Sequence, residues 1–290
     1  MAVFIISSTI DPASTTIKKC LLEKAEWDEV ACFQNLPVFR LTSSHDIYLL
    51  SISDRKITHE HLDKEIKEKL DISPRQLIYL SRHTSETGRP SLTVHPIGNY
   101  GKAEFGGQNK KLVFSSPKLM THLLRLIKYR KQQSTLEFNV CYEVTHHGPY
   151  AETPTLFVEV GSTEKEWIQK KPAIIIAQSL LKLLDSYRYE TDFSSDISVC
   201  IGVGGGHYAP RFTDVILEKN VAFGHMIPSY QIEAGNINEG MLDQALQKTP
   251  NVTAVYLNKK ALKKSQVTLY TTWFKQRGYP VVSSRELPSL

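Results

Sequence analysis

The sequence has few cysteines and no long apolar run. The four cysteines are Cys20, Cys32, Cys141 and Cys200. None forms a C-x-x-C pair, which excludes the common cysteine zinc motifs and is typical of a reducing cytosol. The most apolar stretch, residues 172–184, is interrupted by Gln178 and Lys182 and is too short to span a bilayer. The N-terminus lacks the basic region of a signal peptide. We therefore expect a cytoplasmic protein that has no membrane partner.

Several catalytic signatures are also absent. There is no G-x-S-x-G elbow and no lone cysteine at a strand-to-helix turn, which argues against a serine or cysteine nucleophile. The histidine spacing does not match the H-E-x-x-H zinc motif. The chain shows no internal repeat and no clear linker, so we treat its 290 residues as one unit. A weaker interpretation divides it into an N-terminal lobe, 1–80, and a main catalytic lobe, 81–290.

What is present is an alternation of strand-like and helix-like segments along most of the chain. This pattern predicts an α/β fold with a largely parallel mixed sheet flanked by helices, in one or two lobes. Residues 138–147 are expected to form one of the strands. The segment from Thr84 to about Lys110 is rich in glycine, proline and threonine, and we expect it to be a long functional loop. The net charge of +5 permits a polyanionic partner without requiring one.

A glycine-rich turn lies between the apolar strand predicted at 197–201 and a helix with Pro210 near its first turn. Its glycines are Gly204, Gly205 and Gly206. A dinucleotide fingerprint does not fit, because His207 occupies the position of the third glycine. The glycines could serve only a tight turn. We favour a catalytic or anion-binding turn, since the start of a helix attracts a phosphate or oxyanion.

Histidines follow several predicted strands, and in open α/β sheets the carboxyl ends of strands meet at the ligand site. The motifs are Ser81-Arg82-His83, Thr145-His146-His147, Gly206-His207 and Gly224-His225. Imidazole can act as a general base near neutral pH or bind a metal, but the spacing alone does not establish a metal site. In a regular strand Glu143 and His147 share one face about 13 Å apart, whereas His146 lies on the other face.

Five segments in this order carry a family resemblance. They are Ser81-Arg82-His83, Thr93-Val94-His95-Pro96, Glu143–Pro149, Glu159-Val160-Gly161-Ser162 and Gly204–Arg211. Together they resemble the D-aminoacyl-tRNA deacylases of the archaeal and plant type, and the likeness extends from Asp11 to about Tyr230. The resemblance implies an esterase that proofreads mischarged tRNA by hydrolysing the bond between a D-amino acid and the 3′-terminal ribose. It also implies zinc as a cofactor, without assigning the ligands.

Under this interpretation the residues receive expected roles. His207 and His147 would activate a water molecule, and Glu143 would orient them or act as a base. The candidate zinc ligands are His83, His95, His146 and His225. The candidate contacts to tRNA phosphates are Gly204, Gly205, Gly206, Arg82, Arg211, Lys263 and Lys264. No protein partner is indicated, and the chain could act as a monomer.

Two alternatives remain open from the sequence. One is a binding module for a nucleotide or a tRNA end, in which the glycine turn holds phosphate and the histidines are structural. The other is a peptidyl-tRNA or phosphate-ester hydrolase that uses the same pocket. Release of a D-amino acid from charged tRNA separates the deacylase from the module.

Overall fold

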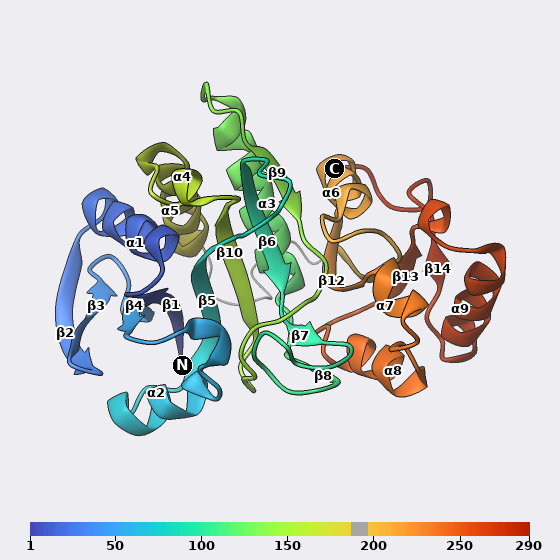
Figure 1. Ribbon diagram of the computed structural model, residues 1–290, viewed down its shortest axis with the longest axis horizontal. Coiled ribbons are helices and arrows are strands. Elements are labelled where there is room, and N and C mark those ends of the chain that lie inside the picture. The colour runs from blue at the N-terminus through green and yellow to red at the C-terminus, as the bar shows by residue number, and fades with distance from the viewer. Residues whose placement is uncertain (187–196) are drawn as a thin grey trace.

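The computed structural model describes residues 1–186 and 197–290, and two sheets form its framework (Figure 1). The eight-stranded sheet contains β1 (Ala2–Ser8), β2 (Trp27–Phe33), β3 (Leu36–Leu41), β4 (Ile47–Ile52), β5 (Pro74–Arg82), β6 (Ser91–Pro96), β9 (Asn139–Tyr142) and β10 (Thr155–Gly161). The four-stranded sheet contains β11 (Ser198–Val203), β12 (Val221–Ile227), β13 (Ala254–Leu257) and β14 (Val281–Val282). A small ribbon pairs β7 (Gly98–Asn99) with β8 (Lys111–Leu112).

Helices cover both sheets. They are α1 (Pro12–Lys24), α2 (Leu62–Leu70), α3 (Pro117–Gln132), α4 (Glu164–Trp167), α5 (Lys170–Ser186), α6 (Pro210–Glu218), α7 (Ser229–Glu233), α8 (Glu239–Gln247) and α9 (Lys264–Gln276). Two short 3₁₀ turns, η1 (Lys56–Thr58) and η3 (Lys259–Ala261), complete the described elements. Within residues 1–186 and 197–290, no helix has the length and apolarity needed to cross a bilayer.

The strand order confirms a mixed sheet in an α/β fold. The large sheet runs β2-β3-β4-β1-β5-β10-β6-β9, with parallel pairing from β4 through β1 and β5 to β10. The β2-β3-β4 meander and the β10-β6 pair are antiparallel. The second sheet, β12-β11-β13-β14, is parallel throughout. Residue 80 lies inside β5, which bonds to β1 and β10, so the large sheet continues through that position.

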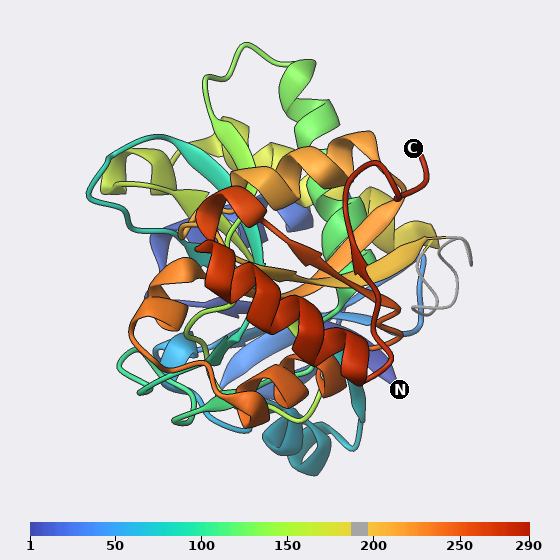
Figure 2. The ribbon, with the colours of Figure 1, turned by 90° about the vertical axis from the view of Figure 1, so that its right-hand side faces the viewer.

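Side-chain alternation along β1 explains how the large sheet is buried on both faces. Val3 and Ile5 belong to one apolar core, whereas Phe4 and Ile6 belong to another. The first core extends into the second sheet through Phe223 and also contains α1, α3 and α5. The second core includes α2. Figure 2 shows α9 lying across the second sheet, where it packs in a third core. The two sheets therefore share apolar packing through the first core.

The start of α1 is fixed by a side-chain cap and a proline. Asp11 precedes α1, and its Oδ1 accepts a hydrogen bond from the Ser14 amide at 2.9 Å. Pro12 occupies the first turn, where its missing N–H has no intrahelical partner to lose. This cap holds the Asp11 carboxylate close to the carboxyl end of β5, since Oδ2 accepts from the Arg82 amide at 3.0 Å.

Two predicted elements were wrong. The segment 84–110 is not a continuous loop, because it contains the fully buried strand β6 and the short strand β7. Its prolines flank or end β6 and do not interrupt the ladder of that strand, whereas Gly106 and Gly107 lie in the loop between β7 and β8. The predicted strand 138–147 ends at Tyr142. Beyond it, the Val144 amide bonds to the His207 carbonyl and the Thr145 amide to the Met226 carbonyl, which draws the chain to the second sheet.

Candidate functional site

The site is a cavity of about 480 Å³ at the carboxyl ends of β5 and β10. Its histidine and carboxylate wall consists of His83, His146, His147, Glu159 and His207. The rest of the wall comes largely from the loop before α1, from η1 and from the loop between β7 and β8, and includes Asp11, Arg55, Lys56 and Phe105. The cavity therefore combines groups that could do chemistry with cationic and apolar groups.

Glu143 is the centre of the histidine cluster. Its side chain is 0% exposed, and its Oε1 lies 3.1 Å from Nδ1 of His83. Its Oε2 lies 3.0 Å from Nε2 of His207 and 3.3 Å from Nε2 of His146. Burial would raise the pKa of Glu143, but the contact with His207 and the charge of His83 lower it. A buried carboxylate is thus kept ionised by surrounding imidazoles.

Glu159 on β10 supplies a second buried carboxylate. Its Oε2 lies 3.4 Å from Nδ1 of His83, and its Oε1 lies 3.7 Å from Nε2 of His95. Burial would lower the pKa of His83, yet Glu159 and Glu143 together raise it to about 10. Nε2 of His83 lies 2.8 Å from the Tyr208 hydroxyl. His83 is therefore a charged bridge between two carboxylates.

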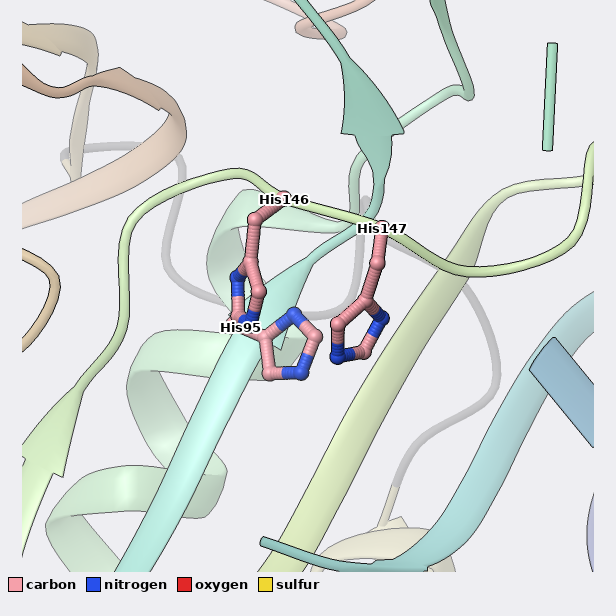
Figure 3. A group of neighbouring side chains, drawn as sticks. All are labelled: His95, His146 and His147. Carbon is pink, nitrogen blue, oxygen red and sulfur yellow. The ribbon is translucent and has the colours of Figure 1, made fainter. Parts of the chain in front are cut away.

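Three imidazoles converge beside these carboxylates: His95 from β6, and His146 and His147 from the loop after β9 (Figure 3). Each offers a nitrogen within 4.8 Å of the others. Burial and neighbouring imidazoles lower the pKa of His146 well below its usual value, and burial and His95 lower the pKa of His147 to about 3. Nε2 of His95 and Nδ1 of His147 are buried without a hydrogen bond.

These donors fit a zinc ion. Neutral imidazole is the form that binds metals, and nitrogen and carboxylate ligands suit zinc. The buried nitrogens without a hydrogen bond are what an absent ligand would leave. Two overlapping groups also bring donor atoms within 4.8 Å: His83, Glu143 and His207 form one, and His95, Glu143 and Glu159 form the other.

The site differs from the strand prediction in how it places His146. A regular strand would put His146 and Glu143 on opposite faces, but the two side chains are in contact. The chain leaves the β geometry after Tyr142, and His147 has a positive φ of 28°. The expected separation of Glu143 and His147 along a regular strand therefore does not apply.

The glycine turn forms as a strand-to-helix connection, with φ of +93° at Gly204 and +123° at Gly205. However, two of its three glycine amides are already used: Gly204 donates to the Ile227 carbonyl and Gly205 to Ser229 Oγ at 2.9 Å. None of the three glycines, Gly206 included, lines the histidine cavity. The turn positions His207 instead. Tyr208, the residue after His207, pairs with Glu143 in an isolated antiparallel β-bridge.

Other predicted contacts lie apart from the cluster. His225 is buried, and its nitrogens face Thr145 Oγ1 at 3.0 Å and the Val113 carbonyl at 2.9 Å, which leaves neither for a metal. Arg211 donates to the Tyr256 hydroxyl and to Ser284 Oγ, in a smaller cavity of about 280 Å³. Lys263 and Lys264 are exposed at the start of α9. Arg82 does line the histidine cavity, and its guanidinium lies 5.0 Å from the Trp167 ring centroid.

Several members of the pocket are not predicted by the sequence. Glu159 stands within one of the family motifs without an expected role, although its place near the end of a buried strand is a usable signal. Lys56 forms a buried ion pair with Asp11, and nothing in its local sequence indicates burial. The same is true of Phe105, whose position depends on how a long loop folds back.

The fold and this site define an α/β protein equipped with the acid–base and metal-ligand groups that hydrolases use. The sequence model for D-aminoacyl-tRNA deacylase matches residues 70–282. A D-aminoacyl-tRNA deacylase of Pyrococcus horikoshii is 36% identical over 88% of this chain and 90% of its own length. One of Methanosarcina acetivorans is 33% identical over 98% of this chain and 92% of its own length. The chain belongs to the D-aminoacyl-tRNA deacylase family.

The fold has also been seen in a crystal structure. The conserved protein of unknown function AF0625 superimposes with a TM-score of 0.87 at 28% sequence identity, covering 99% of this chain and 96% of that one. Both sheets therefore have counterparts in a relative of the same architecture.

Proposed function

We propose that this protein hydrolyses the ester bond of D-aminoacyl-tRNA, releasing the D-amino acid and free tRNA. The family supports this reaction. The observation on which the proposal depends is Glu143, a fully buried carboxylate with imidazoles of His83, His146 and His207 within 3.3 Å. The cysteines are free, which accords with work in the reducing cytoplasm where charged tRNA is used.

In this proposal His207 moves the proton. Its side chain is 39% exposed, so substrate can reach it, while Glu143 fixes its orientation from the buried side. The oxygen of a water attacks the ester carbonyl carbon, and His207 accepts the proton that the water loses. The bond from that carbon to the ribose oxygen then breaks, and His207 returns the proton to this oxygen.

Zinc is the cofactor that we assign to the site, with His95, His146 and His147 as the residues that would hold it. When bound in such a site, zinc lowers the pKa of water and polarises a carbonyl group. The Pro96 carbonyl, 3.1 Å from Nδ1 of His95, would fix the orientation of this ring, as second partners commonly do for metal-bound histidines, and Glu159 lies 3.7 Å from Nε2. The charged His83 would balance both carboxylates.

The function is tested by mixing the purified protein with D-tyrosyl-tRNA and with L-tyrosyl-tRNA and measuring the amino acid released. We expect release from the D-substrate only. His207→Ala should lower this rate by about 100-fold or more, because general acid–base help is lost, with unchanged circular dichroism. His45→Ala, which removes an exposed histidine outside the cavity, should leave the rate unchanged.

Other outcomes would contradict specific parts of the proposal. Tight tRNA binding without release from either substrate would indicate a binding module. Equal release from D-tyrosyl-tRNA and L-tyrosyl-tRNA would contradict the expected selectivity for the D-amino acid. Near-normal turnover by His207→Ala would be consistent with the hydrolase activity but would contradict the role of His207 as the proton carrier.

A further inference from the structure

An exposed aromatic side chain stands at the rim of the cavity. Phe105 is 62% exposed and lines the same cavity as His146, His147 and His207. Ile10, 54% exposed, lines it as well. Most large apolar side chains of the described residues are buried, so two exposed ones that line one cavity suggest a ligand with an apolar surface.

The loop that carries Phe105 is held in place by specific contacts. Gly106 has a φ of +82°, and a Cβ there would lie 1.4 Å from the carbonyl oxygen of Ile57 in η1. The Gly106 carbonyl accepts from Asn99 Nδ2 at 2.9 Å, and the Gly107 amide donates to Glu60 Oε1 at 2.8 Å. The ring of Phe105 is thus presented by a loop packed tightly against the cavity wall.

Two arginines line the same cavity. Arg55 and Arg82 are both exposed and line the cavity, and neither forms an ion pair within residues 1–186 and 197–290. Lys56, which also lines the cavity, forms a buried ion pair with the Asp11 carboxylate. The Arg82 guanidinium lies over the Trp167 ring, but no carboxylate among the described residues neutralises it. An exposed aromatic ring and arginines without an ion pair in one cavity are typical of proteins that bind single-stranded nucleic acids, by base stacking and phosphate contact.

We propose that Phe105 stacks on the terminal base of the tRNA acceptor end, while Arg55 and Arg82 contact its phosphates. This inference rests on the proposed function, which places the ester at His207 and Glu143. The rival occupant of the Phe105 rim is the amino-acid side chain. The cations favour the nucleoside, because phosphates lie only on the nucleoside side of the ester.

Kinetics distinguish the two occupants. Phe105→Ala should raise KM for D-tyrosyl-tRNA by about 5- to 100-fold, the usual effect of losing one stacked base, with kcat little changed. The same loss is expected for D-alanyl-tRNA. Hydrolysis of D-tyrosine methyl ester, which has no nucleoside, should change less than about twofold. Phe105→Trp should restore binding, whereas Phe105→Leu, apolar but not flat, should not.

A matched control is Tyr129→Ala. Tyr129 is an aromatic residue with the same 62% exposure, but it lies on α3 and lines a different cavity. We expect KM for D-tyrosyl-tRNA to stay within about twofold of the unmodified protein. A defect of Phe105→Ala that grows with the size of the amino acid, or that also affects the methyl ester, would overturn the assignment.

A binding measurement separates this inference from the activity. In Phe105→Trp, titration with the trinucleotide CCA should quench indole fluorescence saturably and by more than in the unmodified protein, where only Trp167, beside Arg82, lies near the proposed phosphate contacts. Absence of extra quenching would overturn the stacking. If quenching occurs but the unmodified protein releases no D-amino acid, the hydrolase proposal fails while the nucleoside site stands.

Discussion

His225 differs from the cavity histidines because both of its ring nitrogens are occupied by hydrogen bonds. Burial lowers its pKa to about 4, so it stays neutral in the folded protein at pH values where an unfolded chain binds a proton. Below pH 6.5 the His225 imidazole binds a proton in the unfolded state but stays unprotonated in the folded state. Stability contributed by His225 is therefore full above pH 6.5 and decreases as the pH falls toward 4.

This dependence can be measured by comparison with His225→Gln, which removes the titrating group and keeps hydrogen-bonding capacity. From pH 7.5 to pH 5, the unmodified protein should lose about 2 kcal/mol more unfolding free energy than the variant. Urea unfolding at both pH values, with chelator present in every sample, gives the comparison. Equal losses in the two proteins would show that His225 does not carry the penalty.

For individual residues, the sequence predicted which residue types form the site better than it predicted their contacts. His83, His95, His146, His147 and His207 do gather at one cavity or its border, as convergence of strand ends suggested. Which side chains they contact depends on the backbone conformation, and local sequence patterns do not predict that conformation here. His146 meets Glu143 only because the chain leaves the strand after Tyr142, where bonds to the second sheet replace the ladder.

At the scale of elements, β6 carries His95 into the centre of the site. The strand is fully buried between β10 and β9, so His95 approaches the cluster from a fixed backbone. We expect His95→Ala to weaken zinc binding by more than about 100-fold, since even losing an outer-shell partner costs 10- to 100-fold. Metal content after dialysis and the rise in Tm on adding zinc measure this.

The control for that experiment is again His225→Gln, a buried histidine replaced outside the cluster. It should retain zinc at the level of the unmodified protein. Zinc retained by His95→Ala but lost from His225→Gln would assign the metal to other residues. Zinc absent from the unmodified protein under all loading conditions would remove the metal from the proposal.

The element predictions failed in two ways: composition alone suggested a loop at 84–110, and bonds to distant segments ended the strand predicted at 138–147 at Tyr142. The strand-turn-helix at β11 and α6 was expected from its apolar run and from Pro210. The glycines and prolines of segment 84–110 suggested a loop, but none interrupts the alternating core residues Leu92 and Val94 of β6. Whether glycine amides are free for a ligand also depends on distant residues, such as Ser229, which occupies the Gly205 amide.

At the scale of the whole molecule, positive charge is concentrated after β13. The cluster consists of Lys259, Lys260, Lys263 and Lys264. All four are exposed, in η3 and at the start of α9, and the first two line the smaller cavity beside Arg211. Replacing all four by alanine should weaken tRNA binding. It should also flatten the dependence of log K on log salt by about 0.7 to 0.9 for each phosphate that the variant no longer neutralises.

A control with the same change in net charge uses exposed lysines of α1 and α5. These are Lys19, Lys24, Lys170 and Lys171. Filter binding at several salt concentrations should give this variant nearly the slope of the unmodified protein. An equal reduction of the slope in both variants would mean that overall charge, rather than a surface around α9, attracts tRNA.

The α/β class was predictable because alternating strands and helices are a local signal. The division into an eight-stranded and a four-stranded sheet was not, since strand order depends on pairing between distant segments. For example, β10 inserts between β5 and β6, although β5 ends at Arg82 and β10 begins only at Thr155. Apolar patterns report that a strand is buried, not which neighbour it pairs with.

The loop after β9 is bonded to β12 and to the turn before α6, and this has a consequence for synthesis of the chain on the ribosome. Glu143 is translated long before His207, and the strand that holds the loop, β12, follows later still. When synthesis has passed only β10, the chain already contains the imidazoles of β6 and of this loop, but not β12 or the turn before α6, which hold the loop in place. We therefore expect the histidine cluster to reach its final geometry only late in translation, once the second sheet has emerged.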